Sequence, residues 1–230
     1  MRGAGCTFND IADRDIDGQV ARTALRPLPS GRVTLNQAIG FLLAQLAIGL
    51  LILLQFNGLT ILLGVASLGL VAIYPFMKRI TYWPQFFLGL TFNWGALMGY
   101  SAVAGQLAPA AIALYAAGIF WTLGYDTIYA HQDREDDALL GVKSSALRLG
   151  NNTKPALTLF YACVVGLLTV AGLYAGMNLL YWVGIGVTAW HLAMQIYLLD
   201  IDSPEMCLRL FRSNRDTGLI IAAATLLGTF

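Results

Sequence analysis

The sequence predicts an all-α, polytopic membrane protein whose helices form a bundle of about seven spans. Hydrophobic residues make up 57% of the 230-residue chain and charged residues only 12%, whereas soluble domains carry about 25% charged residues. The charges also fall into four short stretches, and uncharged intervals of nearly equal length separate them (33–77, 80–125 and 155–199). A membrane-spanning helix needs roughly 20 apolar residues. Each interval therefore has room for two spans joined by a turn.

Each interval divides at a turn signal, near Asn57 in the first, Gly105 in the second and Gly176 in the third. The expected spans are 36–55, 59–77, 84–104, 109–128, 155–175 and 179–199. A last apolar stretch, 217–230, is short for a full crossing. Barrel strands would alternate polar and apolar residues, and these runs do not. Helices are then the structure that satisfies the backbone hydrogen bonds in lipid.

All 14 Lys and Arg residues lie in the charged stretches, and the turns at the other ends of the spans hold none. Two spans return the chain to the side that it left, so every charge is expected on one face of the bilayer. By the positive-inside rule this face is cytoplasmic, or faces the matrix in a mitochondrion. We therefore expect an integral protein of the bacterial cytoplasmic membrane or the mitochondrial inner membrane.

Composition also narrows the possible partners. The net charge is +1 and no basic run is present, so nothing indicates a nucleic acid partner. The three cysteines are widely spaced and form no CxxC pair. A disulfide framework or a zinc site is therefore not indicated.

Most acidic residues on the charged face belong to two clusters. The first reads NDIADRDID over 9–17. At about 100° per residue on a helix, one arc of about 100° holds four of its side chains, and Asp15 points to the opposite side. The four are Asn9, Asp10, Asp13 and Asp17.

The second cluster reads DTIYAHQDREDD over 126–137. The same helical spacing turns four of its acids toward one side and leaves Glu135 far from them. The four are Asp126, Asp133, Asp136 and Asp137. Two separate helix ends are thus expected to present a stripe of carboxylates each.

A metal site explains these stripes better than two solvated acidic loops do. Like charges four residues apart repel each other, and carboxylates at a membrane boundary are costly unless they are paired or bind a metal. Oxygen donors without a His or Cys cluster favour Mg²⁺ over zinc or copper. Because Mg²⁺ usually completes its coordination with water and substrate phosphates, the substrate is expected to carry a phosphate or diphosphate.

Cations that could hold such a group are also present on this face. Arg22 and Arg26 precede a proline-rich turn, Lys78 lies four residues after Tyr74, and Lys143 follows a glycine. Any of these cations could instead be a positive-inside anchor.

Both clusters resemble signatures of the UbiA-type intramembrane aromatic prenyltransferases. The first cluster is similar to NDxxDxxxD and the second to DxxYAxxDxxDD. The stretches RPLPSG at 26–31, YPFMKRITYWPQ at 74–85 and GVKS at 141–144 resemble the 4-hydroxybenzoate polyprenyltransferase branch, which makes ubiquinone precursors in proteobacteria and mitochondria. The resemblance covers essentially the whole chain.

The resemblance implies an enzyme that transfers a polyprenyl group from polyprenyl diphosphate to 4-hydroxybenzoate, ortho to its hydroxyl, and releases pyrophosphate. Mg²⁺ and nearby cations would stabilise the departing pyrophosphate, and a dry bundle interior would protect the allylic carbocation from water.

The residue roles follow from the same resemblance. It assigns metal and diphosphate binding to Asn9, Asp10, Asp13, Asp126, Asp133 and Asp137. Asp17 and Asp136 join the expected metal set because they lie on the same helical faces. It assigns diphosphate contacts to Arg22, Arg26, Tyr74, Lys78 and Lys143. Among these, Asp13, Asp133 and Lys78 are the expected catalytic residues. Arg2, seven residues before Asn9, would hold the carboxylate of the acceptor.

Members of this family have nine helices, whereas this chain begins inside what should be the second. We therefore expect 1–230 to be a single transmembrane prenyltransferase domain that lacks the N-terminal helix and most of the next. Neither histidine is assigned to the site. His131 occupies a variable position of the second signature and is interpreted as incidental, and His191 should form a hydrogen bond between helices.

Three alternatives remain. The acceptor could be another aromatic compound, such as homogentisate, a naphthoate or haem. The chain could be an inactive fragment that only binds diphosphate or partner subunits. A divalent-cation transporter would also carry intramembrane acids, but it would need them near the bilayer midplane, and all of these lie at one face.

Overall fold

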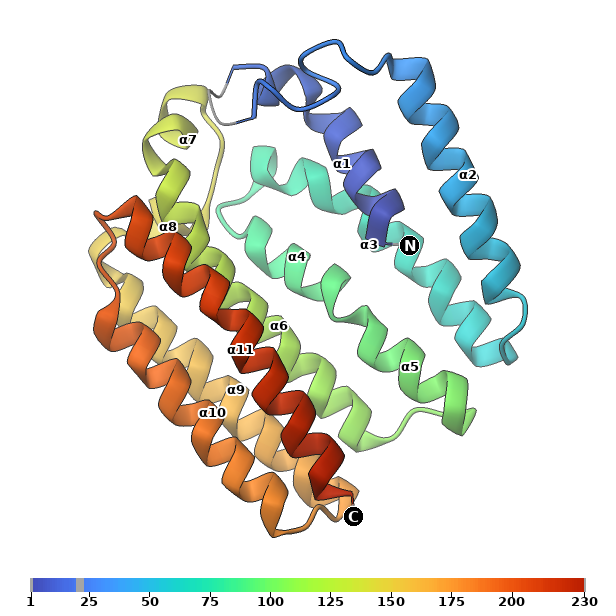
Figure 1. Ribbon diagram of the computed structural model, residues 1–230, viewed down its shortest axis with the longest axis vertical. Helices are drawn as coiled ribbons and strands as arrows, with labels where there is room; N and C mark the ends of the chain where they lie inside the picture. The colour runs from blue at the N-terminus through green and yellow to red at the C-terminus, as the bar shows by residue number, and fades with distance from the viewer. Residues whose placement is uncertain (1, 20–22, 230) are drawn as a thin grey trace.

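The computed structural model describes residues 2–19 and 23–229, without the side chain of Arg2. All regular structure in these ranges is helical, as predicted (Figure 1). The elements are α1 (Arg2–Asp17), α2 (Leu35–Leu53), α3 (Gly58–Ile80), α4 (Pro84–Phe92), α5 (Trp94–Ala104), α6 (Pro109–Ala130), η1 (His131–Asp133), α7 (Arg134–Leu140), α8 (Ser145–Leu149), η2 (Gly150–Asn152), α9 (Thr153–Ala175), α10 (Leu179–Leu198) and α11 (Pro204–Gly228).

Five helical segments are long and apolar enough to cross a membrane, and they contain α2, α3, α6, α9 and α10. Two further crossings take other forms. The predicted span 84–104 is broken at Asn93 into α4 and α5. The Asn93 amide donates to the oxygen of Gly89 at 2.8 Å and to Thr122 Oγ1 at 2.9 Å. The oxygen of Gly89 also accepts from the backbone amide of Asn93 at 3.2 Å, so Asn93 holds the break through its backbone and its side chain.

The last apolar stretch belongs to a longer helix, α11, which is not among the five segments apolar enough to cross a membrane. α11 begins at Pro204, where Ser203 caps it by accepting a hydrogen bond from the Met206 amide. The helix then runs for 25 residues, so the fourth charged stretch forms its first half. Charged residues do not end a helix when they point outward, and the hydropathy of the sequence alone hides this continuity.

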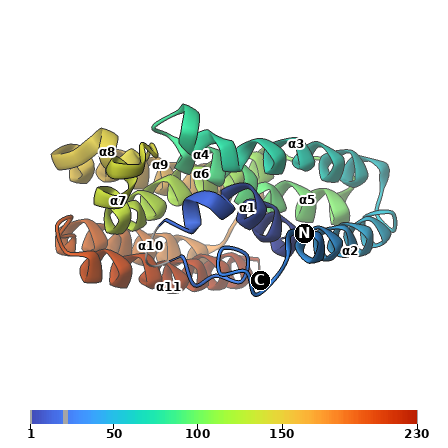
Figure 2. The same ribbon diagram turned by 90° about the horizontal axis from the view of Figure 1, so that it is seen from above.

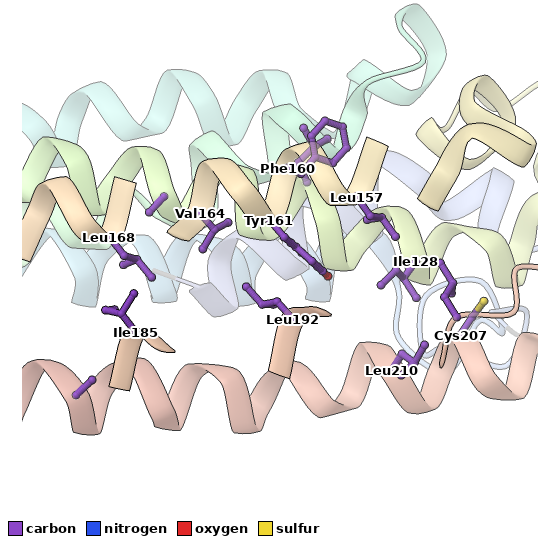
Figure 3. Packing of buried hydrophobic residues seen from close by; sticks show 14 of the residues in the cluster. Ile128, Leu157, Phe160, Tyr161, Val164, Leu168, Ile185, Leu192, Cys207 and Leu210 are labelled. Atoms are coloured by element: carbon purple, nitrogen blue, oxygen red, sulfur yellow. The ribbon is translucent and has the colours of Figure 1, made fainter. Parts of the chain in front are cut away.

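Four helices build the apolar core. α6, α9, α10 and α11 enclose side chains that are almost fully buried, among them Ile128, Leu157, Leu168 and Leu192 (Figure 3). Glycine permits one close approach here, because a Cβ at Gly124 would collide with the ring of Tyr161. The core therefore lies on one side of the molecule, next to the second acidic cluster.

On the opposite side of the molecule, α2 buries little of its surface. Ala38 is the buried residue of α2, and leucines such as Leu43 and Leu51 are more than half exposed. α10 and α11 lie along one side of the molecule and α3 and α4 along the other, with α1 and α6 between them (Figure 2). The acidic cluster at the end of α6 thus lies next to the apolar core, whereas the cluster on α1 lies on the side with few buried side chains.

Candidate functional site

A cavity of about 250 Å³ lies among the helix ends that carry the two acidic clusters. Its polar lining comes from both sides of the bundle. The first cluster contributes Asn9, Asp13 and Asp17, and the second contributes Asp126, Asp133, Asp136 and Asp137. The predicted diphosphate contacts Arg26, Tyr74, Lys78 and Lys143 line the same cavity. The structure therefore brings most of the predicted site residues together.

The first wall of the cavity is formed by α1 and the loop through Arg26. Asp13 is only 3% exposed, and its Oδ2 lies 2.6 Å from Lys78 Nζ. Its Oδ1 is buried without a hydrogen-bond partner among the described atoms, 3.7 Å from Arg79 Nη2. Arg79 also donates to the oxygen of Ala12 at 2.8 Å. Because α3 continues to Ile80, Lys78 and Tyr74 share a face that points at α1.

Arg26 links two acids of the first wall. Its Nη1 lies 2.8 Å from Asp17 Oδ2 and 3.2 Å from Asp10 Oδ1. Thr23 fixes the loop by donating to the oxygen of Asp17 at 2.8 Å. Asp10 lies beside the cavity rather than on its lining, which differs from the single arc that the helical spacing predicts. Its pKa is raised chiefly by burial and further by Asp17 and Asp13, while Arg26 lowers it.

The second wall is formed by the end of α6, η1 and α7. The expectation of one continuous helix through this cluster is wrong, because the chain tightens into a 3₁₀ turn at His131–Asp133. The acids still reach the same cavity, although Asp126 comes from α6, Asp133 from η1, and Asp136 and Asp137 from α7.

His131 anchors this turn from behind. It is 5% exposed, and its Nε2 lies 2.9 Å from Thr153 Oγ1. Since the Thr153 hydroxyl donates its proton to the oxygen of Gly150 at 2.7 Å, it must accept from His131, which is then the Nε2–H tautomer. Arg134 adds a second tie to Asp202 in the α10–α11 loop at 3.1 Å. The interpretation of His131 as incidental is therefore wrong, because its buried ring holds the turn that carries Asp133.

Lys143 closes one end of the cavity on a loop tied to α3. Its backbone amide donates to the oxygen of Lys78 at 2.8 Å, and its Nζ to the oxygen of Ile80 at 2.9 Å. The ammonium lies 5.6 Å from the centre of the Tyr82 ring. Gly141, with φ 68°, supplies the left-handed residue that turns the chain after α7.

Sequence reasoning missed several lining residues. Gln85 is 5% exposed and accepts the Ser145 amide at 3.1 Å. Ser144 caps α8 by accepting from the Leu147 amide. Both stand inside stretches that carried the family resemblance, so a signal was present. Thr23 also lines the cavity, but no motif in the sequence marks it, because only the folded loop brings it next to Asp17.

Other predictions have plain outcomes. His191 Nδ1 lies 2.9 Å from Thr217 Oγ1 of α11, which confirms the expected hydrogen bond between helices. Asp15 pairs with Arg14 and is exposed, on the side away from the cavity. Arg22 and the side chain of Arg2 lie outside the described residues, so their predicted roles remain predictions.

The donor chemistry of the cavity fits Mg²⁺. Within 2–19 and 23–229, no three His, Cys, Asp or Glu side chains are close enough to hold an ion on their own. The carboxylates instead divide between two walls, which suits an ion that also takes phosphate oxygens and water. Asp13 Oδ1, buried and without a hydrogen-bond partner in this part of the chain, is the kind of oxygen that a cation would satisfy.

Comparisons with known proteins agree with this architecture. The model of the UbiA prenyltransferase family matches residues 1–220. The protein named mitochondrial 4-hydroxybenzoate polyprenyltransferase from Aedes aegypti is 55% identical over 230 residues, which is 100% of this chain and 52% of that protein. The human protein of the same name is 51% identical over 229 residues, covering 99% and 62%. The chain thus spans about half to three-fifths of the length of these relatives.

Solved structures share the fold. The apo structure of a UbiA homologue from Aeropyrum pernix K1 matches with a TM-score of 0.84 at 28% identity, covering 100% of this chain and 86% of that one. A UbiA homologue from Archaeoglobus fulgidus bound to DMAPP and Mg²⁺ matches with a TM-score of 0.73 at 20% identity, covering 97% and 82%.

Proposed function

The chain belongs to the UbiA prenyltransferase family, and we propose that it transfers a polyprenyl group from polyprenyl diphosphate to the ring of 4-hydroxybenzoate. The observation that carries this proposal is the pair of acidic walls facing one cavity with Lys78 between them. The names of relatives at 51–55% identity support the choice of substrates. We further propose that residues 1–230 act as one domain in this reaction.

Different residues of the cavity would bind the metal and the diphosphate. Asn9, Asp10, Asp13 and Asp17 from one wall and Asp126, Asp133, Asp136 and Asp137 from the other would hold Mg²⁺. When bound, Mg²⁺ would supply Lewis-acid stabilisation of phosphoryl oxygens. Arg22, Arg26, Tyr74 and Lys143 would contact the diphosphate directly.

Lys78 has the central position among these groups. Its ammonium, 2.6 Å from Asp13 in the structure, would exchange this carboxylate for a phosphate oxygen as substrate enters. Negative charge grows on the leaving pyrophosphate as its bond to the allylic carbon breaks, so a cation fixed at this point favours departure. Asp13, released from Lys78, becomes available as a metal ligand.

The rest of the lining excludes water. Pro84, Leu140 and Val142 line the same cavity and give the allylic carbocation apolar neighbours. Because water would capture such a cation before the aromatic ring does, this shielding favours transfer to the acceptor. Transfer of the ring proton to the released pyrophosphate then restores aromaticity and completes the substitution.

We propose that Arg2 binds the carboxylate of the acceptor. A charge-assisted bidentate contact is worth about 2 kcal/mol when shielded from water. Replacing Arg2 with alanine should therefore raise the KM for 4-hydroxybenzoate far more than the KM for polyprenyl diphosphate. An equal rise in both constants would indicate that Arg2 is a structural anchor.

We also propose that the cavity opens toward the matrix, or the cytoplasm in a bacterium, because all basic residues lie at that end. The relatives carry mitochondrial names, which supports the inner mitochondrial membrane.

One reconstitution tests the activity. The purified protein in liposomes is given Mg²⁺, a polyprenyl diphosphate and 4-hydroxybenzoate, homogentisate or a naphthoate in separate reactions, and prenylated products are measured. We expect product with 4-hydroxybenzoate alone. Product with a different acceptor would change the substrate assignment, and Mg²⁺ flux into the liposomes without any prenyl diphosphate would favour a transporter.

A further inference from the structure

The exposed stripe of α11 is charged along the first half of the helix and apolar along the second half. At 100° per residue its exposed residues fall within an arc of about 140°, opposite buried residues such as Cys207 and Asn214. The first half of this stripe is charged and contains Glu205, Arg209, Arg212 and Arg215. The second half is apolar and contains Leu219, Ala222, Ala223, Leu226 and Leu227. Leu219 and Leu226 are each 62% exposed.

Neighbouring helices show how deep the charged half lies. Trp121 Nε1 donates to Asn214 Oδ1 at 2.8 Å, and Trp121 lies more than two turns before the end of α6 at Ala130. Thr217 meets His191, which lies nearly two turns before the end of α10 at Leu198. Arg215 stands between these two levels, and so lies roughly 10 Å inside the ends of the adjacent helices.

α11 also runs the full length of α10. Cys207, near its start, donates to the oxygen of Asp200 just after α10. At the other end, Asn178, the cap of α10, donates to the oxygens of Leu227 and Gly228. The outer stripe of α11 therefore crosses the same membrane thickness as α10, with its arginines near the charged end.

The three arginines on this stripe differ in their pairing with acids. Arg215 pairs with its neighbour Asp216 at 2.7 Å. In the described part of the chain Arg209 and Arg212 form no ion pair, and none of the three lines the substrate cavity. An unpaired charge on a lipid-facing surface is costly, and the cost falls when the side chain reaches a headgroup at the interface. The guanidinium group matches phosphate oxygens in a bidentate geometry.

We propose that Arg209, Arg212 and Arg215 bind the phosphate of an anionic phospholipid, whose acyl chains lie along the apolar half of α11. The distance from Arg215 to Leu226 along the helix is about 16 Å, close to half the thickness of a bilayer hydrocarbon core. The two arginines without partners favour a lipid with net negative charge over a zwitterionic one. The site is separate from the substrate cavity and stands whether or not the transferase proposal holds.

Lipid retention tests this site. The protein is reconstituted in vesicles of equal parts phosphatidylglycerol and phosphatidylcholine, extracted in mild detergent, and its bound lipids are counted by native mass spectrometry. Each basic residue near an anionic membrane contributes about 1 kcal/mol, or about fivefold in affinity. We expect wild type to retain phosphatidylglycerol selectively, and the Arg209→Gln/Arg212→Gln double variant to retain about tenfold less or lower still.

A matched control is the Arg148→Gln/Lys154→Gln double variant, which also removes two positive charges, from exposed positions on α8 and α9. It should retain phosphatidylglycerol as wild type does. If the α11 double variant is unstable, Arg212→Lys serves instead, because it keeps the charge but loses the bidentate fork and should weaken retention by a smaller factor.

Three results would overturn the proposal. Equal retention of both lipids by wild type would remove the preference for anionic headgroups, and an equal loss in Arg148→Gln/Lys154→Gln would make the effect one of net charge. Displacement of phosphatidylglycerol from wild type by excess geranyl diphosphate would assign the arginines to the substrate rather than to a membrane lipid.

Discussion

The two walls of the cavity carry the same kind of side chain but are held in place by different forces. In the second wall, Thr127 and Ile128 of α6 are fully buried, and the helix packs into the apolar core. In the first wall, the buried described side chains of α1 are Ala4, Asp13 and Asp17. Charge holds this wall instead, through Lys78 at Asp13 and Arg26 at Asp10 and Asp17.

This difference predicts which wall responds to substrate. Apolar packing does not change when an anion enters the cavity, whereas Lys78 and Arg26 must exchange carboxylates for phosphate oxygens. In the described chain Asp126, Asp136 and Asp137 form no ion pair, so these three acids have no such exchange to make. We expect the second wall to be preformed and the first to reorganise around the ligand.

The largest effects should come from one acid on each wall. Asp13→Ala and Asp133→Ala should each lower turnover about a hundredfold or more, because each removes charge from the site of the leaving pyrophosphate. Asp13→Ala should also destabilise the apo protein, by roughly 3 kcal/mol, since it leaves Lys78 without its buried partner. Turnover in liposomes and thermal unfolding separate the two results.

Asp15→Ala is the matched control for this pair, because Asp15 lies on the same helix and is exposed on the far side. It should have nearly wild-type turnover and stability. Near-wild-type turnover in Asp133→Ala would contradict a site built from two walls.

A smaller effect should follow from removing the anchor of the second wall. His131→Leu removes the hydrogen bond to Thr153 and should lower turnover about 10- to 100-fold while raising the Mg²⁺ concentration needed for half-maximal rate. His131→Gln, whose amide can replace the Nε2–H donor, should recover most of the activity. If both variants had the same Mg²⁺ requirement as wild type, His131 would only stabilise the fold.

Hydrogen exchange can measure the difference between the walls directly. Adding Mg²⁺ and pyrophosphate should slow amide exchange in residues 9–17 several-fold, because the ligand orders a wall held by exchangeable ion pairs. Exchange in 120–130, inside the packed core, should change little. Equal protection of both segments would show that the walls respond together.

The fold was largely predictable because hydropathy reports which segments meet lipid. Hydropathy does not report whether a helix continues. α11 extends back to Pro204 through outward-facing charges, and the chain tightens at His131 within a run that reads as one helix. The turn at His131 is held by a contact with Thr153, 22 residues further along the chain, and no periodicity in the sequence reveals such a pair.

Spacing within one helix was enough to predict which side chains share a face. The face shared by Asn9, Asp13 and Asp17 is an example, because all three line the cavity. Spacing failed where partners come from elsewhere in the chain. Arg26 draws Asp10 away from the lining, and Arg79 joins Asp13 across two helices. In the second wall the four acids predicted to share a face all line the cavity, although the helix does not continue through them.

The smallest effect concerns Asp10, which tests whether the first wall is arranged for stability or for binding. Its pKa is raised above the ordinary 3.8, chiefly by burial. The folded state therefore binds this proton more tightly than the unfolded state, so Asp10 lowers the free energy of unfolding as pH rises above about 4. With chelator present, Asp10→Asn should unfold at the same or a slightly higher temperature than wild type at neutral pH, and the small difference should vanish below the ordinary pKa.

The same variant should lose turnover, because it removes one negative charge beside Arg26. A residue that costs stability but is needed for activity would mark the first wall as built to receive a cation and its diphosphate. A clear drop in unfolding temperature for Asp10→Asn at neutral pH would show instead that the pairing with Arg26 outweighs burial. In that case ion pairs would stabilise the first wall as firmly as packing stabilises the second, and the contrast between the walls would disappear.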